Sequence, residues 1–75
     1  MAPLTSFGNG SDIELAFLGL EPATAQRVRE LGLREGAHVA ILQNTDKLIV
    51  RVSGCRIGLR RELAMRIFGS PAAAL

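Results

Sequence analysis

The stretch Leu31-Gly32-Leu33-Arg34-Glu35-Gly36 separates a segment of helical periodicity from a series of strand-like segments. A helix commonly ends at a glycine with positive φ, because glycine has no Cβ to clash there. We therefore predict that a helix ends at Gly32, that Leu33 folds back onto its last turn, and that a strand begins after Gly36. The stretch contains no nucleophile and no cluster of metal ligands. It predicts a rigid corner in a binding scaffold rather than a catalytic site.

On the N-terminal side of this corner, Pro22 suits the first position of a helix, since its missing N–H has no partner there. Val28 and Leu31 continue an apolar stripe at helical spacing. Before the helix, alternation from Asp12 predicts a strand with Ile13, Leu15 and Phe17 on one face. The sequence therefore predicts a strand followed by a helix that begins at Pro22 and ends at Gly32.

On the C-terminal side, apolar and polar residues alternate in three runs, which predict strands at 37–43, 48–52 and 55–59. Hairpin turns at 43–47 and 53–54 join them. Residues 60–68 switch to helical spacing, with Leu63, Ala64 and Ile67 on one face. Gly69 and Pro71 are expected to end that helix. This order predicts a mainly β fold: a small closed barrel with one inserted α-helix and a short C-terminal helical turn.

Length and composition limit the class of protein. The 75 residues are expected to form a single domain, with a core at about 12–68 and loosely ordered ends at 1–11 and 69–75. The formal net charge is +2, and eight of the nine basic residues are Arg. One cysteine cannot form an internal disulfide, and no apolar run approaches the roughly 20 residues of a membrane span. The N-terminus has no signal-peptide pattern, so a cytoplasmic location is expected.

Residues able to support chemistry are few. His38 and Cys55 are the only soft or borderline metal ligands, and a zinc site normally needs three or four protein ligands. Cys55 alternates in phase with Ile57 and Leu59, which predicts a buried thiol, whereas His38 is expected at a solvated rim. The only lysine, Lys47, is not part of a phosphate-binding loop. We expect no catalytic residues, no metal site, no cofactor and no enzymatic activity.

Arginines form the one distinctive polar feature. The densest group is Arg56, Arg60, Arg61 and Arg66, and Arg27, Arg29 and Arg51 extend it. Arginine pairs bidentately with carboxylates and phosphates, so such a group suits an acidic partner. A solvated basic face, a protein-docking surface and a nucleic-acid surface all remain open, although no stacking aromatics support the last. The candidate docking residues are Arg27, Arg51, Arg56, Arg60 and Arg61.

Two segments together resemble the FeoA family, small cytosolic proteins associated with bacterial ferrous iron uptake. The first, residues 26–36, is a basic helix ending in Leu-Gly-Leu with a glycine shortly after it. The second, residues 57–67, is a strand ending in Leu-Arg with an Ala and an Ile beyond it. The residues that carry the resemblance are Leu31, Gly32, Leu33, Gly36, Leu59 and Ala64. The hairpin at 43–47 is shorter than the family's and has no Gly-Asp-Pro.

The resemblance implies an SH3-like β-barrel and a role beside FeoB, the membrane protein that carries Fe²⁺ and has a cytosolic GTP-binding domain. The same barrel occurs in metal-dependent repressors, but their DNA-binding and dimerisation domains are not in this sequence. We therefore expect a non-enzymatic accessory protein that docks on the cytosolic part of a FeoB-type transporter. The alternative is a generic SH3-like adaptor or a nucleic-acid-associated module outside iron transport.

Overall fold

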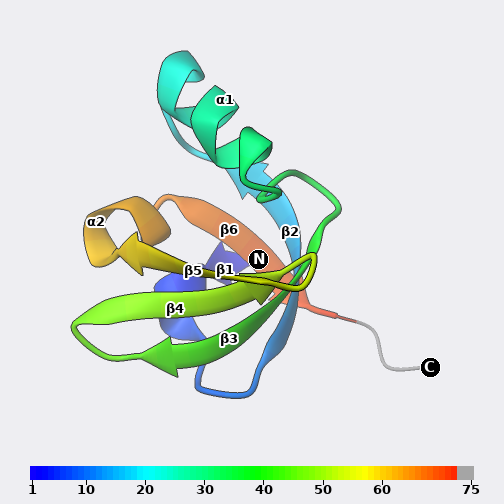
Figure 1. Cartoon of the computed structure of the whole chain (residues 1–75), viewed down its shortest axis with the longest axis vertical. Coiled ribbons are helices and arrows are strands. Elements are labelled where there is room, and N and C mark those ends of the chain that lie inside the picture. Colours follow the sequence, from blue (N-terminus) through cyan, green and yellow to red (C-terminus); the bar gives the residue numbers. More distant parts are fainter. Residues whose placement is uncertain (73–75) are drawn as a thin grey trace.

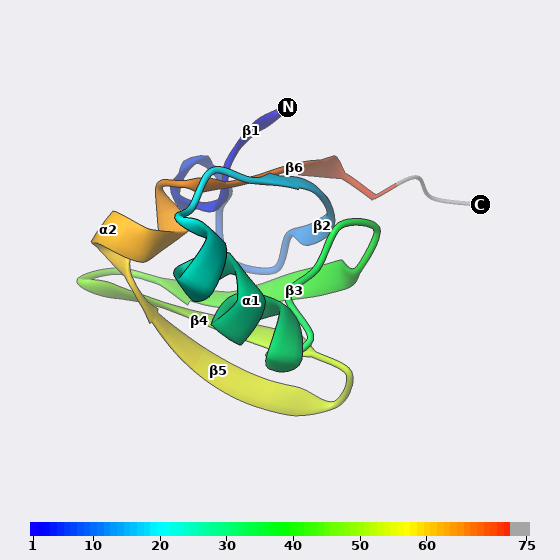
Figure 2. The same cartoon turned by 90° about the horizontal axis from the view of Figure 1, so that it is seen from above.

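The computed structural model describes residues 1–72, which form one antiparallel six-stranded sheet in the order β1-β6-β2-β3-β4-β5. The sheet curls into a small barrel, and α1 stands at one end of it (Figures 1 and 2). Within this part of the chain, no helix has the length and apolar character needed to cross a membrane. The strands are β1 (Ala2–Pro3), β2 (Asp12–Leu18), β3 (His38–Asn44), β4 (Lys47–Val52), β5 (Cys55–Arg60) and β6 (Ile67–Pro71). The helices are the 3₁₀ turn η1 (Leu4–Ser6), α1 (Pro22–Glu30) and α2 (Arg61–Ala64).

The core fills the barrel with one face of each long strand. Val39 and Ile41 of β3 and Leu48, Val50 and Val52 of β4 are buried in alternation with exposed or half-buried neighbours. This is the pattern expected of an antiparallel sheet with one face on the core. The predicted mainly β class, with one inserted helix and a short helical turn after β5, is confirmed.

The predicted corner after α1 has the form of a Schellman motif. Gly32 has a φ of 101°, its N–H donates to the Arg29 carbonyl at 2.9 Å, and the Leu33 N–H donates to the Val28 carbonyl at 3.1 Å. These are the two hydrogen bonds that define this helix ending. Leu33 is fully buried in the core. The predictions for Gly32 and Leu33 are therefore confirmed.

The corner is also hydrogen-bonded to the middle of β2. The Gly36 N–H donates to the Leu15 carbonyl at 2.7 Å, and the Leu15 N–H donates to the Ala37 carbonyl at 2.9 Å. Gly36 has a φ of 87°, so the chain turns sharply here before β3 begins at His38. The corner thus holds the end of α1 and the start of β3 against one point of β2.

The C-terminal region differs from its prediction. The helix predicted over 60–68 stops at Ala64, and Ile67–Pro71 forms β6, which pairs with both β1 and β2. Gly69 does not end a helix but lies inside this strand. A Cβ there would lie 2.6 Å from Ile13 Cγ2 and 2.7 Å from the Glu14 carbonyl oxygen, so only glycine allows β6 to approach β2 this closely. The prediction of a longer helix was wrong because Ile67, whose spacing from Leu63 and Ala64 fits a helix, is instead a buried residue of strand β6.

The chain ends are more ordered than predicted. Leu4 is fully buried, Phe7 packs against the core, and β1 pairs with β6. The expectation of loosely ordered ends is wrong for the residues in β1, η1 and β6, because those segments complete the sheet and cover its core. Residues 73–75 of the predicted tail lie outside the described residues.

Phe17 and Cys55 also differ from their predictions. A β-bulge at Ala16 shifts the phase of β2, so that Leu18 is buried and Phe17 is exposed beside Phe68. Cys55 is exposed, although it lies opposite buried Val52. The prediction placed Cys55 on the correct side of the strand. Its side chain is exposed because Cys55 is the first residue of the edge strand β5, next to a tight turn, where no core residues cover it.

Asn44 links three segments that are far apart in the sequence. Its side-chain amide donates to the carbonyls of Thr5 and Phe7 at 3.1 and 2.7 Å. Its side-chain oxygen accepts a 2.7 Å hydrogen bond from Arg61, which also donates to the Thr45 carbonyl at 2.6 Å. The β3–β4 hairpin, η1 and the start of α2 are therefore held together by one partly buried polar group.

The conformation of Gly32 predicts the effect of a β-branched residue there. Gly32→Val should destabilise the fold by roughly 1–3 kcal/mol, because an L-residue is strained at this φ even though a Cβ would meet its nearest neighbour, Val52, at an ordinary contact distance of 3.7 Å. Each kcal/mol corresponds to about 4–8 °C in the melting temperature of a domain this small. Gly8→Val, at an exposed glycine outside the positive-φ region, is the matched control. Equal melting temperatures for the two variants would contradict the assignment.

The position of Cys55 predicts an accessible thiol. Cys55→Ser should change stability by no more than about 0.5 kcal/mol, as expected of an exposed site. A bulky thiol reagent should modify the native protein as fast as it modifies the protein in denaturant. Strong protection of the native thiol would show that the residue is buried after all.

The hydrogen bonds of Arg61 predict a structural role for this side chain. Arg61→Met should destabilise the fold by about 1–2 kcal/mol, because Asn44 and the Thr45 carbonyl lose a charged donor. Arg60→Met, at the exposed neighbour without such bonds, should change stability by about 0.5 kcal/mol or less. Thermal melts of both variants test this, and an equal loss in the two would refute the role.

Candidate docking surface

The β4–β5 hairpin carries four cationic side chains on its outer face. The register pairs Lys47 with Arg60 and Arg51 with Arg56, and residues directly opposite each other in an antiparallel pair point to the same side. All four are exposed. We call this set, Lys47, Arg51, Arg56 and Arg60, the basic hairpin face.

Between the two cationic pairs lies an uncharged strip formed by Ile49 and Gly58, which are also paired. A Cβ on Gly58 would lie 3.6 Å from Cδ of Lys47, so the aliphatic part of Lys47 extends along this strip. Like charges directly opposite each other in a sheet are destabilising. No ion pair within residues 1–72 neutralises any of the four cations. The face is therefore suited to an anionic surface that supplies the missing charge.

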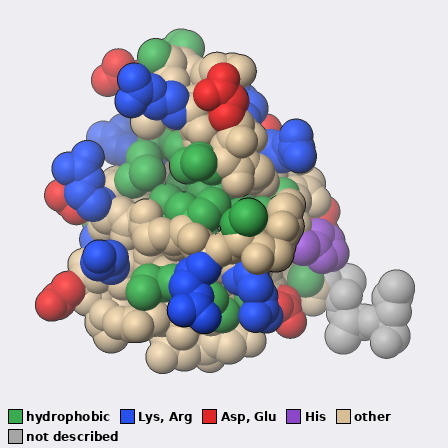
Figure 3. All heavy atoms as spheres, viewed as in Figure 1, with side chains coloured by type: hydrophobic (Ala, Val, Ile, Leu, Met, Phe, Trp, Pro, Cys, Tyr) green, Lys and Arg blue, Asp and Glu red, His purple; other side chains and the backbone are tan. Residues whose placement is uncertain are grey.

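A groove lies beside this face, between α1 and α2. Its floor and walls are Ala23, Thr24, Val28, Leu31 and Leu63, and the side chains of Arg27 and Arg60 border it. Its volume is about 420 Å³. Figure 3 shows hydrophobic side chains gathered across this face of the molecule, with Lys and Arg side chains around them. We call it the α1–α2 groove. It meets the basic hairpin face at Arg60.

Leu31 occupies an unexpected position in this groove. The sequence placed it on the buried stripe of the helix, but its side chain is 54% exposed, whereas Val28 is buried. The helix is anchored to the barrel through Ala25, Val28 and the corner, which leaves Leu31 on the solvent side. The predicted apolar stripe therefore continues into a groove instead of ending in the core.

The five candidate docking arginines occupy four different positions. Arg51 and Arg56 lie together on the basic hairpin face, Arg60 lies between that face and the groove, and Arg27 borders the groove from α1. Arg61 is half-buried and bound to Asn44, so it is held by the fold. Lys47 and Leu63 were not predicted, because only the strand register and the position of α2 bring them to these surfaces.

Another arginine, Arg29 of α1, is paired with Glu35 of the corner. Its guanidinium donates two hydrogen bonds to Glu35, at 3.0 and 3.2 Å. This hydrogen bonding lowers the pKa of the Glu35 carboxyl below its ordinary value and raises the pKa of Arg29. Both groups are largely solvated, so the pair adds little stability. It does remove Arg29 from the cations available to a partner.

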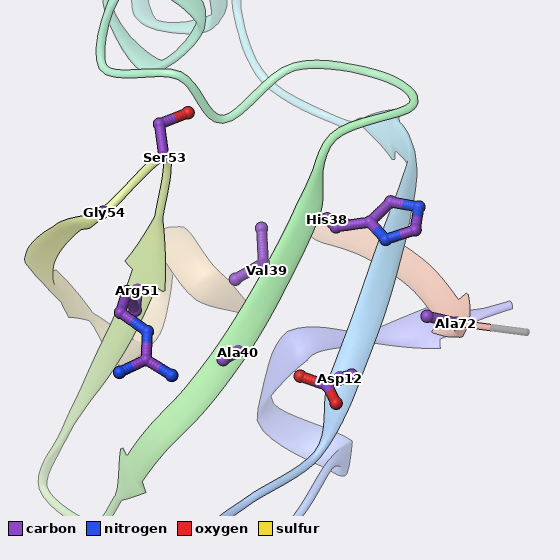
Figure 4. A pocket seen from close by; sticks show the side chains of 8 residues that line it. All are labelled: Asp12, His38, Val39, Ala40, Arg51, Ser53, Gly54 and Ala72. Atoms are coloured by element: carbon purple, nitrogen blue, oxygen red, sulfur yellow. The ribbon is translucent and has the colours of Figure 1, made fainter. Parts of the chain in front are cut away.

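An open hollow of about 440 Å³ lies over β2, β3 and β4 (Figure 4). Asp12 and His38 lie on its β2–β3 side, and Arg51 lines it from β4. His38 is exposed, as predicted, and its Nε2 is 3.9 Å from a carboxylate oxygen of Glu14. Residues 1–72 contain no group of three His, Cys, Asp or Glu side chains that could hold a metal ion. A histidine and one carboxylate are fewer ligands than a zinc site normally has.

Comparison with known proteins was made by family and by structure. The FeoA domain family model matches residues 2–71. A search of curated proteins gave no significant match. The solution structure of FeoA from Chlorobium tepidum has 28% identity and a TM-score of 0.86, covering 95% of this chain and 70% of that one.

A second relative is the crystal structure of Stenotrophomonas maltophilia FeoA complexed with zinc, with 26% identity and a TM-score of 0.79. The match covers 93% of this chain and 90% of that chain. That protein is described as a procaryotic SH3 domain protein and a candidate ferrous iron transport activating factor. The predicted SH3-like barrel is thus confirmed. With a family match over nearly its whole length, the chain belongs to the FeoA domain family.

Proposed function

We propose that this protein is a non-enzymatic accessory factor of ferrous iron uptake that acts in the cytoplasm. It docks on the cytosolic part of a FeoB-type membrane transporter and modulates it. Membership of the FeoA family and the description of the Stenotrophomonas maltophilia relative support the link to ferrous iron transport. The observation that carries docking is the basic hairpin face, whose four cations form no ion pair with any residue from 1 to 72.

The geometry of this face suits an acidic protein surface. Arg51 and Arg56 are directly opposite each other, so their guanidinium groups can each pair bidentately with neighbouring carboxylates. Such exposed pairs contribute modest affinity but accelerate association and orient the partner. Because solvated charges are screened over about 8 Å at physiological ionic strength, docking should weaken with salt. A short-lived, reversible complex fits a modulating role.

The second candidate is a nucleic-acid-associated module, and the same four cations favour it. Proteins that bind single strands usually add aromatic side chains on which bases stack. The outer face of β4 and β5 offers Ile49 and Gly58 between its cations, with no aromatic residue in either strand. The protein-docking function is therefore preferred, and retention on RNA or DNA is a control measurement.

Reversing one charge on the basic hairpin face should weaken docking. Arg56→Glu replaces a cation and also neutralises Arg51 opposite it, so the dissociation constant should rise roughly tenfold. Arg34→Glu, an equal charge change at an exposed residue of the corner, is the matched control and should bind nearly as the parent does. Both variants should melt near the parent temperature, since surface substitutions change stability by about 0.5 kcal/mol or less.

The measurement is a titration of the purified chain against the transporter's cytosolic region, and against the full transporter in lipid, at low and high salt. If the chain binds neither the cytosolic region nor the full transporter in lipid, at low or high salt, the partner assignment is refuted. Binding that is insensitive to salt and to Arg56→Glu would refute the role of the basic hairpin face. Salt-sensitive binding to RNA or DNA that exceeds binding to the transporter would favour the second candidate.

A further inference from the structure

The α1–α2 groove is an apolar surface that the fold builds and leaves uncovered within residues 1–72. Leu31 forms one wall and Leu63 the other, with Val28 beneath them. Val28 belongs to the hydrophobic core of the barrel and Leu63 packs against that core, so the floor of the groove is continuous with the core. Exposed apolar surface that borders polar residues commonly marks an interaction site.

The exposure of Leu31 is imposed by the backbone around it. Its N–H is bonded to the carbonyls of Arg27 and Val28, and the next residue, Gly32, is held in the Schellman geometry. The side chain cannot retract into the core, because Leu33 already occupies the buried position at this end of the helix. The wall of the groove is therefore preformed, and a ligand would bind without first reordering it.

The charges around the groove determine what it can bind. Arg27 borders it from α1, and Arg60 borders it from the end of β5. Within residues 1–72 neither guanidinium forms an ion pair, and no acidic side chain lines the groove. An apolar floor between two unpaired cations is complementary to a segment that carries both apolar side chains and carboxylates.

We propose that the α1–α2 groove binds an acidic, apolar segment of a partner protein. Apolar side chains of that segment enter between Leu31 and Leu63, and its carboxylates pair with Arg27 and Arg60. Further acidic residues of the same segment reach the basic hairpin face, since Arg60 belongs to both surfaces. The inference rests on the proposed function only for the identity of the protein that carries the segment. The chemistry of the segment follows from the groove itself.

The test uses a synthetic, end-capped helical peptide. Its Leu residues recur every three or four positions and form one face, and Glu residues flank that face. One matched peptide replaces every Glu by Lys, and another replaces every Leu by Ser. Backbone amide chemical shifts of the full chain are followed during titration. The Leu–Glu peptide should shift the signals of α1, the Gly32–Ala37 corner and α2 in a saturable manner. The two matched peptides should leave these signals nearly unchanged.

Two variants distinguish binding in the groove from nonspecific binding to exposed apolar side chains. Leu31→Ser should raise the dissociation constant of the Leu–Glu peptide roughly tenfold, because it removes one apolar wall of the groove. Met65→Ser is the matched control, since Met65 is 56% exposed, close to the 54% of Leu31, but does not line the groove. Met65→Ser should bind as the parent does, and both variants should keep the parent fold.

The outcomes distinguish this inference from the proposed function. Groove shifts that require both Leu and Glu, and that Leu31→Ser weakens, support the inference even if the transporter's cytosolic region fails to bind. Three results would overturn it: unchanged groove signals, equal shifts with the Lys or Ser peptide, or equal weakening by Met65→Ser. Binding of the transporter region to the parent chain tests only the proposed function.

Discussion

The hydrogen bonds between the Gly32–Ala37 corner and Leu15 decide where α1 lies on the barrel. Two glycines at positive φ allow the chain to end a helix, turn twice and reach β3 within a few residues. The turn at Gly32 directs Leu33 into the core. At the turn that follows, the Gly36 N–H donates to the Leu15 carbonyl. Strand β2, helix α1 and the start of β3 therefore share one anchor point.

Both candidate surfaces depend on that anchor. Because the corner holds the C-terminal end of α1, Leu31 is exposed and faces α2 across a groove. Because β3 starts at a fixed place, the register carries through β4 to β5, and the four cations align in pairs. The barrel thus presents an apolar groove and a basic face that meet at Arg60. Shallow, preformed surfaces of this kind suit a protein that binds another protein.

Several predictions failed where tertiary contacts outweigh local pattern. The spacing of Leu63, Ala64 and Ile67 satisfies a helix, but pairing with β2 makes Ile67 part of a strand. Phe17 lost its expected phase because the bulge at Ala16 adds one residue against β6. Cys55 kept its phase but lies at the end of an edge strand, where the core no longer reaches. Periodicity in the sequence indicates which residues share one side of a helix or strand. Whether that side is buried depends on which other segments pack against it.

The sequence by itself determined the helix, its ending at Gly32, the three central strands and their turns, since these depend on local backbone preferences and on period-two alternation. The two paired motifs also pointed to the FeoA family. Only the tertiary structure decided the strand β6, the structural role of Arg61 and the grouping of Lys47, Arg51, Arg56 and Arg60. These features depend on cross-strand register and on which segments meet in space, and neither is encoded in the spacing of residues along one element.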